Sequence, residues 1–389
     1  MFKIKTYNKI ASIGTKNFEN TKYDVGDNVE DPDAILVRSA NLLDIKFPES
    51  VKAIARAGAG VNNIPLDICT EKGIVVFNTP GANANAVKEL AIAALLLSSR
   101  DIIGGVNWVS KLDLDDGIAK EVEKGKSKFG GPELYGKTLG IFGLGAIGAM
   151  VANTAAEFGM EVYGYDPYIT VDSAWTISRN VKKANDPKII FNNSDYIALH
   201  VPSNPETKGF INSESISLMK TGVRIINLSR ADLVNNADMK NALDNGKVSC
   251  YVTDFPTEET VDMKNVITIP HLGASTPESE DNCAIMAVNE LIDYLENGNI
   301  KNSVNFPDVI NPKATEESVC VIHKNIPNML AQISATLSDE SINIENLSSR
   351  SKREVGYSVF EISGKCPENV VRKLTAINGI IRVFVIKNN

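Results

Sequence analysis

The stretch TLGIFGLGAIG, residues 138–148, decides the fold because it joins an apolar run to three closely spaced glycines. Its first half predicts a buried strand, and the Ala-rich sequence after it predicts a helix. Gly143, Gly145 and Gly148 form the pattern G-x-G-x-x-G. In such a turn the first glycine permits the bend and the second lets the backbone approach a pyrophosphate. The third lets helix and strand pack closely, so the stretch predicts a dinucleotide-binding turn.

The next predicted strand supports a ligand in this turn. Residues 160–166 end in Asp166, at about the 20-residue spacing where an acid hydrogen-bonds the adenosine ribose. A carboxylate there repels a 2′-phosphate, so the pattern favours NAD over NADP. The helix N-terminus offers free N–H groups for the phosphates. The alternative is a tight strand–helix turn that binds nothing.

Outward from this unit, predicted strands alternate with helices, which indicates parallel sheets covered by helices. In the glycine-rich domain the predicted strands are residues 138–143, 160–166, 196–201, 223–229, 249–255 and 266–270. In the preceding part they are residues 3–7, 34–39, 51–58 and 74–78. Beyond a Pro-containing linker at 305–318, the pattern is β-α-β-β-α-β. The expected fold class is α/β, with two doubly wound (Rossmann- or flavodoxin-like) parallel-sheet domains and a C-terminal ferredoxin-like domain.

Bulk composition limits the possible partners. The chain of 389 residues is too long for one hydrophobic core. Its formal net charge of −8 argues against nucleic acid as a partner. The longest apolar run, residues 90–97, is too short for a bilayer, so no membrane association is expected. The five cysteines include no Cys-x-x-Cys pair, which predicts no metal site and fits a reducing, cytoplasmic compartment.

Three polar residues stand at or just beyond strand ends in the second half of the glycine-rich domain. They are Arg230, Glu258 and His271, and this edge is where doubly wound sheets bind ligands. The set suits oxidation of a 2-hydroxy acid. His271 would take the hydroxyl proton, Glu258 would hold the imidazole, and Arg230 would pair with the substrate carboxylate or the C2 oxygen. Taken singly, each also fits a structural role: a surface arginine, a solvated acidic loop, and a histidine that closes a strand.

With these residues in place, about residues 1–310 resemble the D-isomer-specific 2-hydroxyacid dehydrogenase family. The matching blocks include FGLGAIG, YDP, IINLSRADLV, DFPTE and PHLGAST. The resemblance implies that the family's catalytic Arg, Glu and His are Arg230, Glu258 and His271. The cofactor contacts that it implies are Gly143, Gly145, Ala146, Ile147, Gly148, Asp166, His200, Val201, Pro202, Thr207, Ser229, Asp254 and Gly273. The substrate contacts that it implies are Arg38, Ser39, Ala59, Gly60, Val61 and Asn83.

The resemblance also implies a domain plan and a reaction. Residues 1–95 with 285–310 would bind substrate, residues 96–284 would bind NAD, and catalysis would occur in the cleft between them. The family implies a homodimer or homotetramer, with residues 102–121 as an exchanged arm. The blocks ILVRSA and GAGVNNIPLD are most similar to members that oxidise D-3-phosphoglycerate to 3-phosphohydroxypyruvate, the first step of L-serine synthesis. The alternatives are a reductase of glyoxylate, hydroxypyruvate or a related 2-keto acid, and a non-catalytic NAD-sensing protein.

One departure from the family pattern concerns the acids near the catalytic histidine. Counting back from Glu258 puts Thr253 where an aspartate often meets the nicotinamide carboxamide. Anchoring on Asp254 instead would make Glu259 the catalytic acid. The block FPTE favours Glu258, but the choice between the two glutamates stays open.

Two further departures concern the substrate. The usual Arg-Gly is Arg230-Ala231 here, so no glycine-only backbone geometry is expected at that point. Cations for a substrate phosphate are sparse. Arg38 is the first candidate, followed by Arg56 and the lysines of residues 111–137.

The C-terminal residues 316–389 resemble an ACT domain, a small-molecule sensor, through the block VIHKNIPNMLAQISATLSDESINIENL. The resemblance implies L-serine as an effector, held by His323, Asn325 and Asn343. A domain used only for dimerisation is the alternative. Where the motif often has Pro-Gly, this chain has Asn328, which tolerates a left-handed backbone better than most residues.

Overall fold

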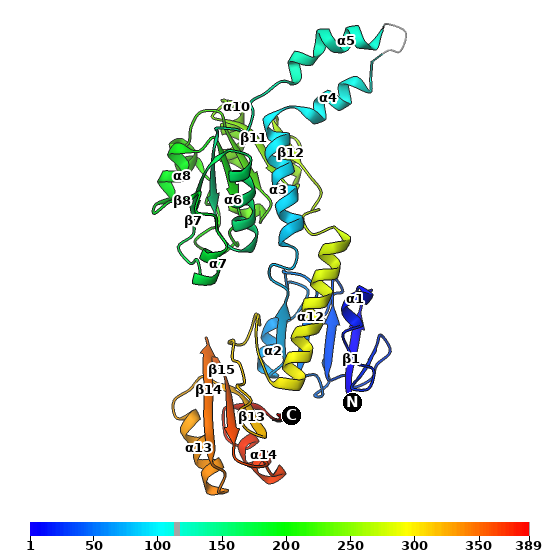
Figure 1. Cartoon of the computed structure of the whole chain (residues 1–389), viewed down its shortest axis with the longest axis vertical. Helices are drawn as coiled ribbons and strands as arrows, with labels where there is room; N and C mark the ends of the chain where they lie inside the picture. The colour runs from blue at the N-terminus through cyan, green and yellow to red at the C-terminus, as the bar shows by residue number, and fades with distance from the viewer. Residues whose placement is uncertain (113–116, 389) are drawn as a thin grey trace. The chain divides into compact units, whose positions relative to one another are not determined.

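The structure, a computed structural model, describes residues 1–112 and 117–388. The chain divides into two compact units, Met1–Asn83 with Pro277–Asn389, and Ala84–Thr276 (Figure 1). The sequence predicted these divisions later in the chain, at 95/96 and 284/285. Packing explains the difference: helix α3 (Ala84–Ser99) contacts helices and strands of the second unit, whereas α12 (Pro277–Asn297) contacts the sheet of the first.

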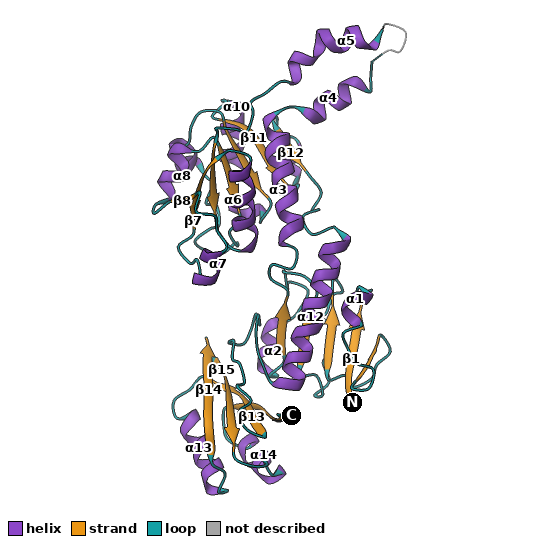
Figure 2. Cartoon of the chain, in the orientation of Figure 1, coloured by secondary structure: helices purple, strands orange, loops and turns teal. Residues whose placement is uncertain are grey.

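The first unit contains a parallel sheet with strand order β2-β1-β3-β4-β5 (Figure 2). Its strands are β1 (Phe2–Tyr7), β2 (Tyr23–Gly26), β3 (Ala34–Val37), β4 (Ala53–Arg56) and β5 (Val75–Asn78). The helices within Met1–Asn83 are α1 (Ser12–Thr15) and α2 (Leu66–Glu71). This is the flavodoxin-like order, as the predicted fold class requires. The prediction omits β2, whose sequence YDVG contains no apolar run.

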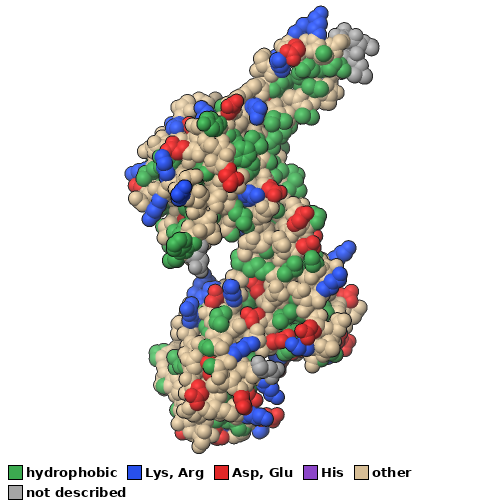
Figure 3. All heavy atoms as spheres, in the orientation of Figure 1, with side chains coloured by type: hydrophobic (Ala, Val, Ile, Leu, Met, Phe, Trp, Pro, Cys, Tyr) green, Lys and Arg blue, Asp and Glu red, His purple; other side chains and the backbone are tan. Residues whose placement is uncertain are grey.

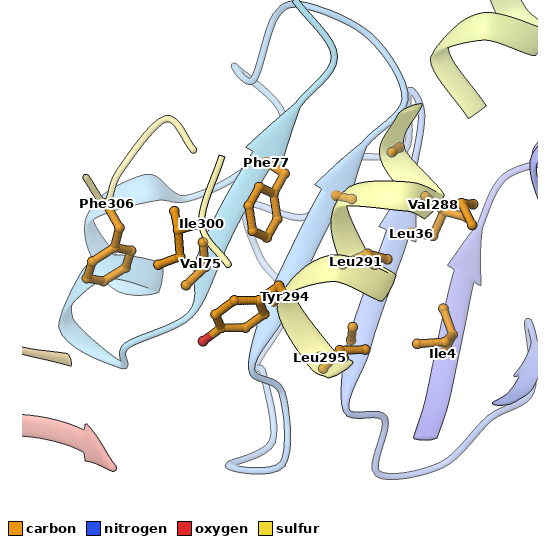
Figure 4. Packing of buried hydrophobic residues seen from close by; sticks show 14 of the residues in the cluster. Ile4, Leu36, Val75, Phe77, Val288, Leu291, Tyr294, Leu295, Ile300 and Phe306 are labelled. Carbon is orange, nitrogen blue, oxygen red and sulfur yellow. The ribbon is translucent and has the colours of Figure 1, made fainter. Parts of the chain in front are cut away.

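The core of the first unit lies between this sheet and α12 (Figure 4). Val288, Leu291 and Leu295 repeat at helical spacing and are buried in one cluster with Ile4 and Leu36 of the strands. Burial of a side chain of this size contributes about 1.5–3 kcal/mol. The apolar periodicity of α12 therefore fixes it on the first sheet.

The segment predicted as a linker, residues 305–318, belongs partly to this core. Phe306 is fully buried in the same cluster, and Val309 forms an antiparallel bridge with Ile300. The first half of the segment is therefore packed rather than free. Its prolines indicate irregular backbone correctly, but its apolar side chains hold it against the unit.

The second unit contains a parallel sheet with strand order β12-β11-β10-β9-β6-β7-β8. The strands are β6 (Thr138–Phe142), β7 (Glu161–Tyr165), β8 (Val181–Lys183), β9 (Tyr196–Leu199), β10 (Val223–Asn227), β11 (Val248–Thr253) and β12 (Val266–Thr268). The helical elements besides α3 are α6 (Ala146–Glu157), α7 (Val171–Trp175), α8 (Pro187–Asn193), α9 (Ser213–Leu218), the 3₁₀ turn η3 (Ala231–Leu233), α10 (Asn236–Asp244) and α11 (Glu258–Val261). The Rossmann-like order is confirmed, with one more strand than predicted, the short polar edge strand β8. The order reverses between β6 and β9, and ligands of such sheets bind at this switch point.

An arm extends from the second unit through α4 (Ile102–Val109), α5 (Ile118–Gly125) and the 3₁₀ turn η2 (Lys126–Phe129). Hydrophobic side chains gather on its surface (Figure 3). Val106 of α4 is 63% exposed. Residues 113–116 of the predicted exchanged arm lie outside the described residues. The described part carries the apolar surface that such an arm requires.

The C-terminal part of the first unit has the predicted β-α-β-β-α-β arrangement in an antiparallel sheet, β14-β15-β13-β16. Its elements are β13 (Glu317–Lys324), α13 (Met329–Asp339), β14 (Ile344–Lys352), β15 (Val355–Ile362), α14 (Glu368–Thr375) and β16 (Ile380–Lys387). Asn328 has a φ of 71°, so the left-handed position expected there is present. The Tyr357 hydroxyl donates to the carbonyl of Gly298 just after α12, at 2.5 Å. No helix in the described ranges is long and apolar enough to cross a membrane.

Candidate active site

The glycine-rich turn has the geometry that its sequence predicts. Gly143 has a φ of +88°, and a Cβ there would lie 2.5 Å from the carbonyl oxygen of His200. A Cβ at Gly148 would lie 1.9 Å from the carbonyl oxygen of Gly143. Gly145 precedes α6, and a Cβ there would meet no atom within 4 Å. Two glycines are thus required by internal packing, while the open side of Gly145 leaves room for a ligand beside the helix N-terminus.

Asp166 lies directly across this turn. Its Oδ2 accepts a hydrogen bond from the backbone N–H of Leu144 at 2.8 Å, and its Oδ1 accepts one from Tyr168 at 2.9 Å. Each carboxylate oxygen keeps a second lone pair. The acid is therefore held at the glycine-rich turn and can still accept bonds from ribose hydroxyls.

The turn after β9 is organised by its own side chains. The Thr207 hydroxyl donates to the carbonyl of Pro202 at 2.6 Å, and the Ser229 hydroxyl donates to that of Leu199 at 2.7 Å. Burial lowers the pKa of His200 to about 4, so this imidazole is uncharged at neutral pH. These residues shape the edge of the sheet, and His200 is unsuited to proton transfer near pH 7.

Arg230 follows β10 and presents an exposed guanidinium. Its Nη1 donates to the carbonyl of Ser229 at 2.6 Å, while its own carbonyl accepts from the Asn227 amide at 2.8 Å. Ala231, the next residue, is not among the described residues with positive φ. The alanine in place of the usual glycine therefore causes no backbone strain, as the sequence analysis expected.

Asp254, directly after β11, is the most deeply buried acid at this edge. It is 1% exposed, and its Oδ1 has no hydrogen-bond partner in the part of the chain that the structure describes. Burial raises the pKa of its carboxyl, and the nearby charges of His271 and Arg230 oppose that rise. The neighbouring Thr253 accepts a bond from the N–H of Phe255 at 3.2 Å. The structure thus places His271 and Arg230 near enough to Asp254 to influence the pKa of its carboxyl.

His271 lies beyond β12 with an exposed side chain, and its ring centre is 4.8 Å from that of Phe255. Glu258 is the first residue of α11 and is exposed. The neighbouring Glu259 accepts a bond from the Asn236 amide at 2.7 Å. Within the described ranges, neither glutamate hydrogen-bonds the imidazole. The Glu259 carboxylate is therefore held by a residue of α10, and the Glu258 carboxylate is more available to the imidazole of His271.

Residues expected to contact substrate lie at the carboxyl edge of the first sheet. Arg38 follows β3, and its carbonyl accepts a bond from Nε of Arg56 at 3.1 Å. Gly58 has a φ of +147°, and a Cβ there would lie 2.1 Å from Nη1 of Arg56. The carbonyl of Ala59 accepts from the Asn78 amide at 2.5 Å. Arg56, ranked second by the sequence, therefore lies against both Arg38 and the loop that contains Gly60 and Val61.

Among the residues that the structure describes, the remaining ones predicted to contact substrate form no hydrogen bond with the side chains of Arg38 or Arg56. The backbone N–H of Ser39 donates to Oδ1 of Asn8 at 3.0 Å. Asn83 is partly buried and is the last residue before the second unit begins. On the arm, the lysines considered as phosphate ligands include Lys124, which pairs with Glu121 at 2.6 Å. The two arginines are thus the best-placed cations on the first sheet.

The predicted effector residues separate in the structure. A cavity of about 390 Å³ in the C-terminal part is lined by His323 and Asn325, and also by Arg350, which the sequence analysis did not select. His323 is 5% exposed, and its Nδ1 donates to the carbonyl of Lys324 at 2.8 Å. Its Nε2 bonds the hydroxyl of Ser358 at 2.9 Å. Both ring nitrogens are therefore engaged.

Asn343 does not line this cavity. Its amide donates to Oε1 of Glu345 at 2.8 Å. Within one copy of the chain, only part of the predicted effector set comes together.

Comparison with known proteins identifies the class of this chain. The family described as "D-isomer specific 2-hydroxyacid dehydrogenase, NAD binding domain" matches residues 92–273. The D-3-phosphoglycerate dehydrogenase of Escherichia coli K12 is 30% identical over 399 residues, covering 97% of this chain and 94% of the relative. The chain therefore belongs to the D-isomer-specific 2-hydroxyacid dehydrogenase family, and its central part is the family's NAD-binding domain.

Other relatives carry the same name. The D-3-phosphoglycerate dehydrogenase of Methanocaldococcus jannaschii is 33% identical over 332 residues, which cover 83% of this chain. The alignment spans 60% of that relative, and 47% of the Mycobacterium bovis one. The solved 3-phosphoglycerate dehydrogenase of Entamoeba histolytica with bound NAD⁺ has a TM-score of 0.60 at 28% identity, covering 78% of this chain and 98% of that structure. The predicted resemblance is thus confirmed for the family.

Proposed function

We propose that the protein oxidises D-3-phosphoglycerate to 3-phosphohydroxypyruvate with NAD, as the first step of L-serine synthesis. The observation that carries this proposal is the set of Arg230, Asp254 and His271, which follow the neighbouring strands β10, β11 and β12. Similarity to relatives named D-3-phosphoglycerate dehydrogenase favours this substrate over other 2-hydroxy acids.

The glycine-rich turn fits NAD. Gly145 leaves an open side at the N-terminus of α6, where backbone N–H groups suit a pyrophosphate. Asp166 is fixed to accept the ribose hydroxyls. The turn at His200–Pro202 with Thr207 and Ser229 would bound the rest of the cofactor, with Asp254 and Gly273 on its nicotinamide side. When bound, NAD supplies the acceptor for the hydride that leaves C2.

The protein's own side chains would transfer the hydroxyl proton and stabilise the charges of the substrate and the imidazole. His271 takes the proton of the C2 hydroxyl as the C2–H bond breaks. Arg230 pairs with the substrate carboxylate and the C2 oxygen through its exposed guanidinium. Glu258 orients the imidazole and stabilises its charged form, a role for which Glu259 is less available because it bonds Asn236.

Substrate binding would use the carboxyl edge of the first sheet. Arg38 and Arg56 supply two cations for the phosphate. Ser39, Asn83 and the backbone of Ala59–Val61 complete this set. Glyoxylate has no phosphate group to pair with these two guanidinium groups, so the pair favours a phosphorylated acid over glyoxylate.

We further propose that the C-terminal part acts as an ACT-like domain that binds L-serine between copies of the chain. The cavity with His323 and Asn325 supports this, and Asn343 would contribute from another copy or after rearrangement. A domain used only to join a homodimer or homotetramer would bind no serine.

The test is a steady-state assay of NADH absorbance with D-3-phosphoglycerate, hydroxypyruvate and glyoxylate. We expect kcat/KM for the phosphoglycerate pair to exceed that of the other acids. A hundredfold preference for a non-phosphorylated acid would overturn the substrate assignment. Failure of every 2-hydroxy or 2-keto acid, with NAD still bound, would instead favour the NAD-sensing alternative.

A further inference from the structure

The first unit contains a cavity of about 480 Å³ beside α12, separate from every residue assigned above. Its polar lining comes from the helix and the loop that follows it, and includes Asn289, Glu290, Asp293, Asn299, Lys301 and Asn302. Its apolar lining includes Ala82, Ile285 and Met286. The cavity therefore combines hydrogen-bonding groups, both signs of charge and a hydrophobic wall.

Glu290 is the unusual member of this set. It is 8% exposed, and its Oε1 accepts a bond from the Asn302 amide at 2.9 Å. Its buried Oε2 has no hydrogen-bond partner within the described residues. A buried polar oxygen without a partner costs about 1–3 kcal/mol. A bound donor that reached Oε2 from the cavity that Glu290 lines would remove that cost.

We propose that this cavity binds a small organic ammonium compound, with Glu290 receiving its N–H donors. An ammonium group brings three donors and a positive charge, which match a carboxylate with a free oxygen. Ile285 and Met286 would contact the carbon skeleton. A bare metal ion suits the site less well, because its ligands must converge to about 2.0–2.6 Å and this cavity is wide and partly apolar.

Lys301 further restricts the chemical class of the expected ligand. It lines the same cavity with a side chain of opposite charge to Glu290. A ligand that carries a carboxylate as well as an ammonium group can pair with both. An α-amino acid with a short apolar side chain should therefore bind more tightly than an amine of similar size.

Binding should also depend on pH. Burial raises the pKa of Glu290 to about 8, with the charge of Lys301 opposing the rise and that of Asp308 adding to it. Asp293, from the same helix, is the other acid that lines the cavity. Free protein near pH 7 therefore holds the Glu290 proton, and an ammonium ligand must displace it. Affinity should rise several-fold between about pH 7 and about pH 8.5.

The experiment is isothermal titration calorimetry of the full chain with n-butylammonium chloride, L-norvaline and n-butanol. We expect the two ammonium compounds to bind and release protons, measured in two buffers of different ionisation enthalpy. Glu290→Gln, which keeps the acceptor for Asn302, should weaken binding by about tenfold or more. Asp308→Asn removes an exposed acid outside the cavity lining and should retain binding, with a slightly higher affinity near pH 7 because Asp308 raises the pKa of Glu290.

Several results would overturn the proposal. They are equal binding by Glu290→Gln and wild type, n-butanol binding as well as n-butylammonium, no proton release, or no binding of either ammonium compound. Tighter binding of L-norvaline than of n-butylammonium supports the role of Lys301, and equal or weaker binding of L-norvaline would contradict that role. Thermal unfolding of each variant shows whether it is folded, so a loss of binding is not mistaken for a loss of structure.

Discussion

Glu280 near the start of α12 forms an ion pair with Arg38 at the end of β3, with Oε1 and Nη2 separated by 2.5 Å. The two side chains are 42% and 41% exposed, so the pair contributes little to stability, on the order of 0–1 kcal/mol. The ion pair matters for substrate binding. The Glu280 carboxylate pairs with the Arg38 guanidinium, which the proposed function assigns to the phosphate of the substrate.

The first prediction concerns this competition. In Glu280→Gln, Arg38 should be free for the substrate phosphate, so KM for D-3-phosphoglycerate should fall by a few-fold at nearly constant kcat. Glu278→Gln, at an exposed site two residues away on the same helix, is the matched control. An increased KM in Glu280→Gln would show instead that Glu280 holds Arg38 in its binding position.

The second prediction concerns His271. His271→Ala should leave NAD affinity unchanged, because the glycine-rich turn is untouched, and should reduce kcat by about 10²- to 10⁴-fold. NAD binding is measured by calorimetry and turnover by NADH absorbance. Unchanged turnover would assign His271 a structural role. The comparison variant His200→Asn should affect NAD binding more than the chemical step.

The third prediction separates the acids near His271. Glu258→Gln should reduce kcat by at least about tenfold, because the imidazolium loses its partner. Glu259→Gln should change kcat little, since Glu259 bonds Asn236 on α10. The pH profiles of kcat/KM for both variants and for Asp254→Asn provide the check. A large defect in Asp254→Asn together with an active Glu258→Gln would make Asp254 the partner of the imidazole.

The fourth prediction concerns the pH dependence of stability. The pKa of Glu290 is raised to about 8 in the folded chain, so the folded state keeps a proton that the unfolded state loses above about 4.5. This group's contribution therefore falls as pH rises from about 4.5 to about 8, by up to a few kcal/mol. Glu290→Gln should be more stable than wild type at pH 8 and similar at pH 4.5. Urea unfolding at both pH values measures this, and parallel pH dependences would contradict it.

The fifth prediction concerns the loop after β4. Gly58→Ala places a methyl group on the Arg56 guanidinium and at a φ of +147°, which should cost about 1–3 kcal/mol. KM for the phosphorylated substrate should rise because Arg56 must move. Gly60→Ala is the control for stability, since its nearest neighbour would be 3.6 Å away and no positive φ is involved. Equal stability losses in the two variants would show that Arg56 does not depend on Gly58.

The sequence by itself predicted both doubly wound sheets, the C-terminal arrangement, the dinucleotide turn and the family. These features depend on local rules: apolar periodicity, and glycines such as Gly143 and Gly148 at positions where a Cβ would clash. The short strands β2 and β8 were not predicted because they carry no apolar pattern. They are extended because they pair with β1 and β7. The missed packing of Phe306 has the same kind of cause, since a burial site on the first unit overrides local loop signals.

Only the tertiary structure decided which side chains interact. It paired Glu280 with Arg38, tied Glu259 to Asn236, and brought Asp254 near His271 and Arg230. It also showed that Glu290 is buried and that its Oε2 has no partner among the residues described, whereas helical spacing alone could not tell an exposed acid from a buried one. The reason is physical. Chain-local patterns determine backbone conformation, but partners and solvent exposure depend on residues distant in the chain.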